Sequence, residues 1–162
     1  MHDPKDFLLQ KRLREKYLLP FESKILHISQ NGSYFERQVL IWCIINYVPL
    51  TQFKKGQLLI TFYEDWCSNP NYELNRVYNY IGLGTSTLND INDRSKFTSP
   101  SKTSASKEFN INEWKSNLST IEINAGQEIL KCFGFDKLYD SNSSPHHKHI
   151  DDFLSKQVNN KG

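Results

Sequence analysis

The chain has 162 residues, which is enough for one domain with a hydrophobic core. Hydrophobic residues make up 38% and aromatic residues 13% of the sequence, a composition that favours a globular protein over a disordered one. The formal net charge of +2 is too small to predict nucleic-acid binding as a property of the whole surface. An anion-binding site must therefore come from a local cluster of basic side chains.

The cellular compartment is predicted from the cysteines and the apolar runs. Cys43, Cys67 and Cys132 are odd in number and widely spaced, which favours reduced thiols over disulfides or a zinc site. Residues 1–6 carry no apolar signal core, and the longest apolar run, residues 39–45, is far shorter than the roughly 20 residues that span a bilayer. These features predict a soluble, cytoplasmic protein without membrane contact.

The first third of the chain predicts helices. Apolar residues recur at helical spacing over residues 7–17, and a second, short helix is expected over residues 22–28. Residues 34–47 are apolar on nearly every side, which predicts a core helix with Ser33 as its N-cap. Pro49 is expected to end this helix.

The next segment predicts the one strand of the chain. Residues 58–63 form a continuous apolar, partly β-branched run, the pattern of a strand that is covered on both faces in a parallel sheet. A helix over residues 72–81 follows, with Asn69 as N-cap, Pro70 in its first turn and Gly82 just past its end. One strand cannot make a sheet, so either more strands are hidden in loops or the chain is part of a larger α/β domain.

The C-terminal half predicts a loop, a helix and a tail. Residues 85–110 are rich in Ser, Thr and Asn, which is typical of a long loop. Ser119 begins the clearest capping box of the chain. We expect the domain to cover residues 1–140, and residues 141–162 to form a flexible polar tail that holds at most a short helix over residues 150–157.

The order of motifs around the predicted strand resembles a known family. A strand, a Tyr-Glu-Asp triplet at residues 63–65, an Asn-Pro pair at residues 69–70 and a helix follow one another. This order resembles the C-terminal half of sulfotransferases that use 3′-phosphoadenosine 5′-phosphosulfate (PAPS). The resemblance covers about residues 7–139 and is greatest to bacterial, cyanobacterial-type members. It implies an α/β fold, part of a P-loop-NTPase-like sulfotransferase fold, that is mostly helical in this chain, with residues 58–63 as a parallel-type strand.

The resemblance also implies a cofactor site. The tyrosine of the family's Tyr-Glu-Asp triplet lines the adenine pocket, whereas a core tyrosine is the alternative on sequence grounds. Residues 94–107 hold four basic and seven hydroxyl side chains, the donors that a phosphate needs, although a solvated loop would have the same composition. The side chains expected to contact the cofactor are Tyr63, Arg94, Ser101, Lys102 and Thr103.

Other candidate residues are interpreted as structural. Trp114 resembles the family's tryptophan before the last long helix, and Trp42 and Asn46 match positions on the core helix, so packing roles are expected for all three. A metal site is not predicted, because the histidine-rich tail has no frame to hold ligand geometry. These tail histidines are His146, His147 and His149.

Two motifs of the family are missing from this sequence. Family enzymes hold the 5′-phosphosulfate in a glycine-containing loop with a lysine, and a second strand supplies Arg and Ser for the 3′-phosphate. Neither motif is present, and the general base, usually a His or Glu, has no assignable counterpart. Because the missing donors stabilise the charge that develops during transfer, we expect the chain to be inactive by itself.

The leading hypothesis is therefore the C-terminal portion of a PAPS-dependent sulfotransferase. It would transfer a sulfuryl group to a hydroxyl or amine of a small-molecule or glycan acceptor, once a separately encoded N-terminal half is supplied. The alternative is a non-enzymatic helical interaction protein that descends from a sulfotransferase and self-associates or binds a partner through exposed apolar surface.

Overall fold

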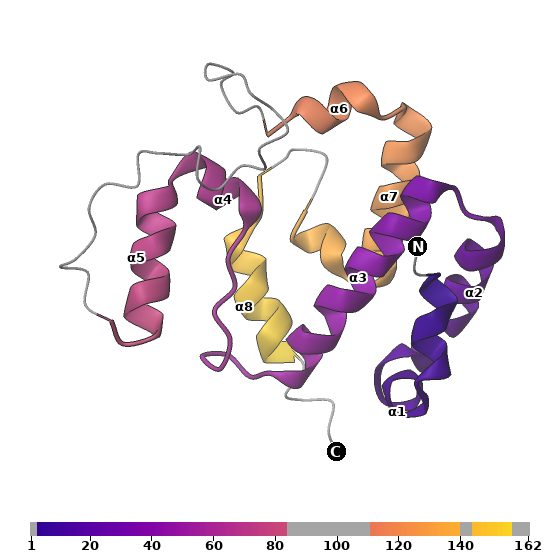
Figure 1. Cartoon of the computed structure of the whole chain (residues 1–162), viewed down its shortest axis with the longest axis horizontal. Helices are drawn as coiled ribbons and strands as arrows, with labels where there is room; N and C mark the ends of the chain where they lie inside the picture. The colour runs from indigo at the N-terminus through magenta and orange to yellow at the C-terminus, as the bar shows by residue number, and fades with distance from the viewer. Residues whose placement is uncertain (1–2, 84–110, 140–143, 157–162) are drawn as a thin grey trace. The chain divides into compact units, whose positions relative to one another are not determined.

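The computed structural model describes residues 3–83, 111–139 and 144–156, and every regular element within them is a helix (Figure 1). The α-helices are α1 (Lys11–Leu13), α2 (Glu22–Asn31), α3 (Tyr34–Gln52), α4 (Tyr63–Ser68), α5 (Pro70–Tyr80), α6 (Glu113–Asn117), α7 (Thr120–Cys132) and α8 (His147–Lys156). Three 3₁₀-helices, η1 (Pro4–Leu9), η3 (Leu19–Phe21) and η6 (Phe135–Lys137), and a π-helix, η2 (Arg14–Leu18), lie between them. None of the helices in the described ranges combines the length and apolarity of a membrane span.

The chain divides into two units. The first consists of Met1–Leu58 together with Trp114–Gly162, and the second is Leu59–Glu113. The first unit holds the N-terminal helices through α3, and also α7, η6 and α8. The second unit holds an extended segment, residues 59–62, followed by α4 and α5.

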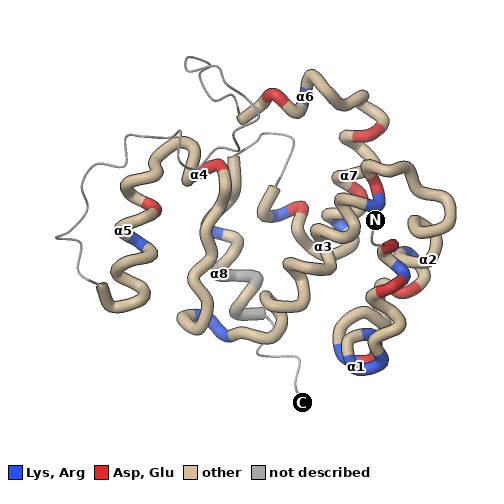
Figure 2. The backbone as a smooth tube through the Cα atoms, viewed as in Figure 1, with Lys and Arg blue, Asp and Glu red and all other residues tan. Residues whose placement is uncertain are grey.

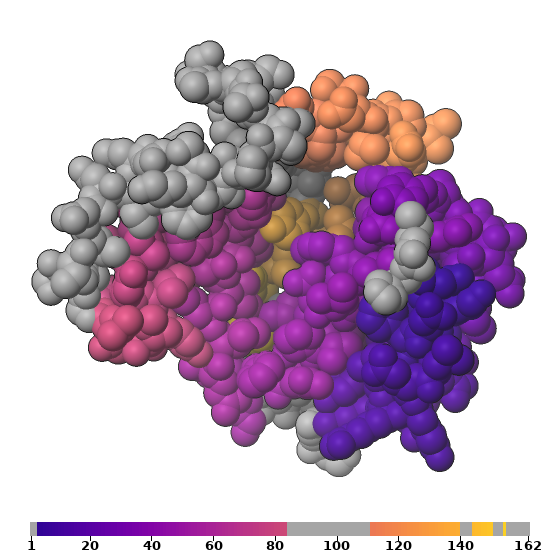
Figure 3. All heavy atoms as spheres, viewed as in Figure 1, coloured from indigo at the N-terminus to yellow at the C-terminus, as the bar shows by residue number. Residues whose placement is uncertain are grey.

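The core of the first unit lies between α3 and α7, with α2 and the N-terminal turns packed against α3. Three rings join these elements: Phe21 stacks on Phe133 with ring centroids 4.1 Å apart, and Tyr47 meets both rings edge-on. In Figure 3 the indigo N-terminal helices and the purple α3 share one continuous surface. The other buried apolar side chains of this unit are Leu18, Ile25, Ile28, Leu40, Cys43, Ile44, Leu50, Ile129, Phe135, Leu138 and Leu154.

Helix α3 differs from its prediction at its end and on one face. Pro49 does not end the helix, which continues to Gln52. A proline near the C-terminus removes one hydrogen bond, here to the carbonyl of Ile45, and that residue is 54% exposed, so water can reach its backbone. Trp42 and Ile45 are exposed while Leu40 and Ile44 are buried, so the helix has one exposed face and one face that other elements of the first unit cover.

Local start and stop signals predicted several helix ends correctly. Ser33 and Ser119 cap α3 and α7, and in each capping box the glutamate three residues later returns a hydrogen bond to the backbone N–H of the serine. Gly82, at φ 77°, follows α5 in a Schellman motif, in which the N–H of Leu83 donates to the carbonyl of Tyr78 at 2.9 Å.

The predicted strand over residues 58–63 is wrong in the described part of the chain. Residues 59–62 are extended, but no strand pairs with them there, and Tyr63 is the first residue of helix α4 instead of the last residue of a strand. An apolar, β-branched run favours extended backbone, but only a neighbouring strand turns such a segment into a sheet. The residues that the structure describes are therefore mostly helical, and they contain no parallel sheet.

Beyond residue 140 the structure contains a helix, α8, which begins at His147, earlier than the short helix expected over residues 150–157. It packs against α3, and its Leu154 is only 3% exposed. Part of the predicted tail thus contributes to the core of the first unit.

Candidate functional site

The best-defined candidate site lies in the second unit, where the extended segment meets α4. Phe62 is 6% exposed and has extended backbone angles, φ −106° and ψ 141°, immediately before the helix begins at Tyr63. The backbone changes from extended to helical between these two residues, and Tyr63 is 65% exposed.

An ion pair on α5 holds the extended segment in place. Arg76 donates through Nη1 to both carboxylate oxygens of Glu73, at 2.7 Å each, and through Nη2 to the carbonyl oxygen of Ile60 at 3.3 Å. In a sheet, the Ile60 carbonyl would accept a hydrogen bond from a neighbouring strand, and here the guanidinium takes that role. The side chain of Arg76 therefore anchors the segment that leads to Tyr63.

The Glu73 carboxylate is buried, at 1% exposure, so it needs a cation to offset its desolvation. Its hydrogen bond raises the pKa of Arg76, and the nearby charge of Asp65 raises it further. Arg76 thus pairs directly with Glu73 on its own helix, and the charge of Asp65 in the first turn of α4 acts on it as well. This arrangement keeps the guanidinium charged and joins α5 to the backbone of the extended segment.

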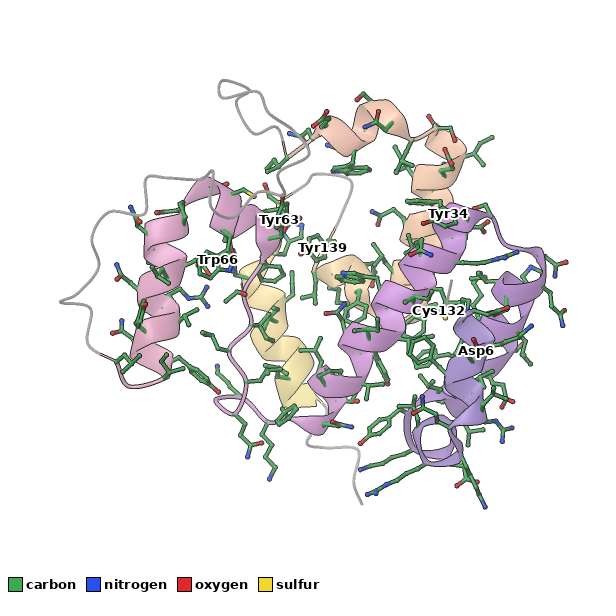
Figure 4. The ribbon with its side chains drawn as sticks, in the orientation of Figure 1. Asp6, Tyr34, Tyr63, Trp66, Cys132 and Tyr139 are labelled. Carbon is green, nitrogen blue, oxygen red and sulfur yellow. The ribbon has the colours of Figure 1, made fainter. Side chains whose placement is uncertain are left out.

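The phenol of Tyr63 is the most accessible aromatic group next to this anchor. Partial burial raises the pKa of Tyr63, and a hydrogen bond with Cys67, one turn later, also raises it. The ring is therefore a neutral, flat surface at ordinary pH that can stack on a planar ligand. Figure 4 shows Tyr63 at the start of α4 and Trp66 on the side of the same helix that is nearer α5.

Glu64 and Asp65 lie in the first turn of α4. Carboxylates in this position interact favourably with the partial positive charge of a helix N-terminus. The same two charges repel a phosphate, so a ligand at Tyr63 would present an uncharged group to this turn.

Sequence reasoning missed Glu73 and Arg76 as parts of the site. The signal was present, because Glu73 lies four residues before Val77 and so falls on the apolar stripe of the helix. An acidic residue on a buried face requires a partner, and Arg76, three residues on, is within reach on the same helix. What the spacing could not indicate was the second contact of Arg76, to the backbone of Ile60.

The other predicted cofactor contacts cannot be compared with the geometry. Arg94, Ser101, Lys102 and Thr103 lie outside the described residues, so the phosphate-binding loop stays a prediction. Tyr63 is the one predicted contact that the structure describes.

Of the residues expected to have packing roles, Trp42 makes ring contacts with other elements. The Trp42 ring meets Phe135 and Tyr139 edge-on, at centroid distances of 5.4 and 5.8 Å. Asn46 donates from Nδ2 to the backbone carbonyl of Trp42 at 2.8 Å, within α3. Trp114 carries the ammonium of Lys115 at 5.6 Å from its ring centroid.

Among the described side chains, no group of three or more His, Cys, Asp or Glu residues is arranged to hold a metal ion. His146 and His149 lie near each other, with ring centroids 6.2 Å apart, but they contact edge-on. Cys43, Cys67 and Cys132 are present as thiols and not as disulfides, and burial raises the pKa of Cys43 far above its ordinary value.

Comparison with known proteins assigns the family. The model of the sulfotransferase domain matches residues 16–161, which is most of the chain and includes α8. Neither the curated proteins nor the solved structures contain a match to this sequence. Members of the matched family generally use PAPS as the sulfate donor. The chain belongs to the sulfotransferase domain family.

Proposed function

We propose that this chain takes part in sulfuryl transfer from PAPS to a hydroxyl or amine acceptor, as the C-terminal portion of the catalytic unit. The observation that carries this proposal is the exposed Tyr63 ring at the start of α4, in a chain that matches the sulfotransferase domain over residues 16–161. In this proposal Tyr63 stacks on the adenine of the donor. The remaining parts of the site are assigned from the chemistry of the donor.

The position of Tyr63 suits the adenine end of the cofactor. Adenine is planar and uncharged, whereas the other end of PAPS carries all its phosphate and sulfate charge. Glu64 and Asp65 next to Tyr63 would repel those charged groups, so the neutral base is the part that fits this turn. Arg76 supports the contact indirectly, since it fixes the backbone at Ile60, three residues before the ring.

The charged end of the donor requires cations, which we assign to the basic loop. Arg94 and Lys102 would bind the 3′-phosphate, and the hydroxyls of Ser101 and Thr103 would donate further hydrogen bonds. In the sequence, these residues follow α5 and are therefore C-terminal to Tyr63. Their assignment rests on composition and on the resemblance of the Pro-Ser-Lys-Thr element.

The catalytic groups themselves are not assigned to this chain. The sequence has no glycine-containing loop with a lysine for the 5′-phosphosulfate, and no residue stands out as the general base. We propose that a separately encoded polypeptide supplies them, and that the active assembly is cytoplasmic. The acceptor would be a small molecule or a glycan.

Binding of 3′-phosphoadenosine 5′-phosphate, measured by calorimetry, tests this proposal. We expect Tyr63→Ala to weaken binding by about tenfold, because stacking on an aromatic ring contributes about 1–3 kcal/mol per base. Tyr63→Phe should retain most of the affinity, because the ring remains. Tyr72→Ala is the matched control, since Tyr72 is similarly exposed, at 60%, on the neighbouring helix α5.

Two results would contradict the cofactor assignment. One is that the folded chain fails to bind the nucleotide, both alone and mixed with a candidate N-terminal half. The other is equal weakening by Tyr63→Ala and Tyr72→Ala, which would mean that the loss does not come from the Tyr63 ring. Adenosine 5′-monophosphate, which lacks the 3′-phosphate, should bind more weakly if the basic loop contributes as proposed.

A second candidate function is a non-enzymatic interaction protein with the same ancestry. Large apolar side chains are exposed on several helices, including Ile45 at 54% and Ile121 at 81%. Such side chains favour contact with a partner or a second copy. Size-exclusion chromatography with light scattering distinguishes the two candidates, because a monomer at all concentrations that binds the nucleotide would exclude the interaction protein.

A further inference from the structure

The first unit contains a cavity that the proposed donor site does not use. Its volume is about 460 Å³, which is within the usual range for small-molecule sites. Five of its lining residues come from the segment between η1 and η3, which contains α1 and η2. The sixth comes from the last turn of α3. The lining residues are Gln10, Arg12, Leu13, Lys16, Tyr17 and Gln52, so the wall holds two cations and no carboxylate.

The basic residues of this segment divide into two groups. Arg14 is paired with Glu22, at 2.8 Å between Nη2 and Oε1, and Lys11 lies 4.0 Å from Glu15. These two cations do not line the cavity. The local carboxylates thus neutralise the basic side chains that point elsewhere.

The two cations on the cavity wall have no such partner. Within the described part of the chain, no ion pair joins Arg12 or Lys16 to a carboxylate, and the contact recorded for the Lys16 ammonium is with the Tyr17 ring, 5.0 Å from its centroid. Figure 2 shows the blue basic positions gathered around α1, and Figure 3 shows this indigo segment at the surface. The cavity therefore has a net positive wall that is open to solvent ions.

Two of the lining residues belong to a π-helix, which is an unusual backbone conformation. Residues Arg14–Leu18 form a π-helix, closed by the N–H of Leu19 donating to the carbonyl of Arg14. This turn is one residue wider than an α-helical turn, and π-turns are rare and found frequently at functional sites. Lys16 and Tyr17 both belong to it, so the widened turn forms one wall of the cavity.

We propose that this cavity binds a small hydroxylated molecule that carries a sulfate or phosphate ester. Arg12 and Lys16 would bind the ester oxygens through charge-assisted hydrogen bonds. The amides of Gln10 and Gln52 would bind hydroxyl groups, since an amide both donates and accepts, and the side chain of Leu13 would contact an apolar ring face. The site is independent of the proposed donor site, because none of its six residues is assigned to that site and all six lie in the other unit.

Titration of the full chain with four probes tests the chemistry of the ligand. We expect glucose 6-sulfate and glucose 6-phosphate to shift the backbone amide NMR signals of residues 10–17, and the tighter of the two identifies the ester. Glucose and inorganic sulfate should each bind at least about tenfold more weakly, because a charged hydrogen bond contributes about 1.5–3 kcal/mol. No saturable shift with either ester would overturn the proposal.

Two pairs of substitutions distinguish binding of the ester in the cavity from nonspecific attraction of an anion to the basic segment. Arg12→Gln with Lys16→Gln should weaken ester binding by at least about tenfold. Lys11→Gln with Lys131→Gln removes the same total charge from exposed positions outside the cavity and should leave binding within about twofold, because exposed charges are screened by salt. Equal weakening by both pairs would overturn the proposal. Circular dichroism checks that each variant is folded.

Discussion

At the scale of single residues, Arg76 has the largest effect on the candidate site. It neutralises Glu73, which is almost fully buried, and it donates to the backbone of Ile60. Two separate functions, charge compensation and backbone anchoring, therefore depend on one guanidinium. Lysine could supply the charge but not the fork of donors that reaches both acceptors.

We predict that Arg76→Met destabilises the second unit by about 3 kcal/mol, because it leaves a buried carboxylate without its cation. The side chain of Arg76 is 30% exposed, so water offsets part of the loss and the effect should be at the lower end for a buried pair. Urea unfolding followed by Trp66 fluorescence measures this change. A Trp42→Phe, Trp114→Phe background makes Trp66 the sole tryptophan of the chain.

A second variant shows whether the buried charge is the cause. Glu73→Gln combined with Arg76→Met removes both charges, and it should recover at least about 1 kcal/mol relative to Arg76→Met alone. Arg76→Lys should fall between the wild type and Arg76→Met, because it keeps the charge and loses the Ile60 contact. If the double variant is no more stable than Arg76→Met, the Glu73–Arg76 pair does not stabilise the protein through charge compensation.

At the scale of elements, the capping boxes of α3 and α7 respond to pH. The backbone N–H of Ser33 lowers the pKa of Glu36 from its ordinary value of 4.5, and the N–H of Ser119 does the same to Glu122. Because each folded-state pKa is depressed, the unfolded chain binds more protons in this window and stability rises with pH. The contribution is complete above the ordinary pKa and is lost as pH falls through the lowered one.

We therefore predict that stability decreases below about pH 5 in part through these two carboxylates. Wild type and the Glu36→Gln, Glu122→Gln variant are compared by urea unfolding between pH 3 and pH 7. The variant should show a shallower decrease, since glutamine keeps a hydrogen-bond acceptor and does not titrate. Parallel profiles for the two proteins would exclude the capping boxes as a source of the pH dependence.

Helix α8 leads to a prediction about the C-terminal boundary of the domain. Leu154 is 3% exposed and its helix packs on α3, so Leu154→Ala should cost about 2 kcal/mol of unfolding free energy. Lys148→Ala, on the exposed part of the same helix, is the control and should change little. A flexible tail that begins at residue 141 predicts no effect from either substitution, which thermal unfolding would reveal.

At the scale of the whole molecule, the two units differ in how much they bury. The first unit has a core shared by α2, α3, α7, η6 and α8, whereas the buried side chains in the described part of the second unit are Phe62 and Glu73. Local stability follows the apolar surface that each part removes from water. The second unit should therefore open more readily than the first.

Hydrogen exchange measures this difference. We predict that backbone amides of α5 exchange faster than those in the middle of α3 and α7, by at least about a hundredfold. Addition of 3′-phosphoadenosine 5′-phosphate should slow exchange in α4 and α5 if Tyr63 contacts the nucleotide. Equal protection in both units would mean that they unfold as a single cooperative body.

Much of the helical structure followed from local sequence signals. The capping boxes at Ser33 and Ser119 and the left-handed glycine at Gly82 act over three or four residues, so the sequence contains all their partners. The end of α3 was mispredicted at Pro49, because the cost of a proline depends on whether the carbonyl left behind is exposed. That exposure is a property of tertiary packing.

The candidate site was predictable only in part, and for the same reason. The order of the Tyr-Glu-Asp and Asn-Pro motifs, at residues 63–65 and 69–70, with the segments after them resembled the sulfotransferases, and the match over residues 16–161 confirms this family. The role of Tyr63 in binding the cofactor stays a prediction. Only the tertiary structure decided that Tyr63 begins a helix and that Arg76 holds Ile60 in the place of a neighbouring strand. Motifs and helix caps depend on residues that are close together in the sequence, so the sequence alone is enough to predict them. The conformation of an extended segment depends on whichever distant group satisfies its backbone, and that group is determined by packing.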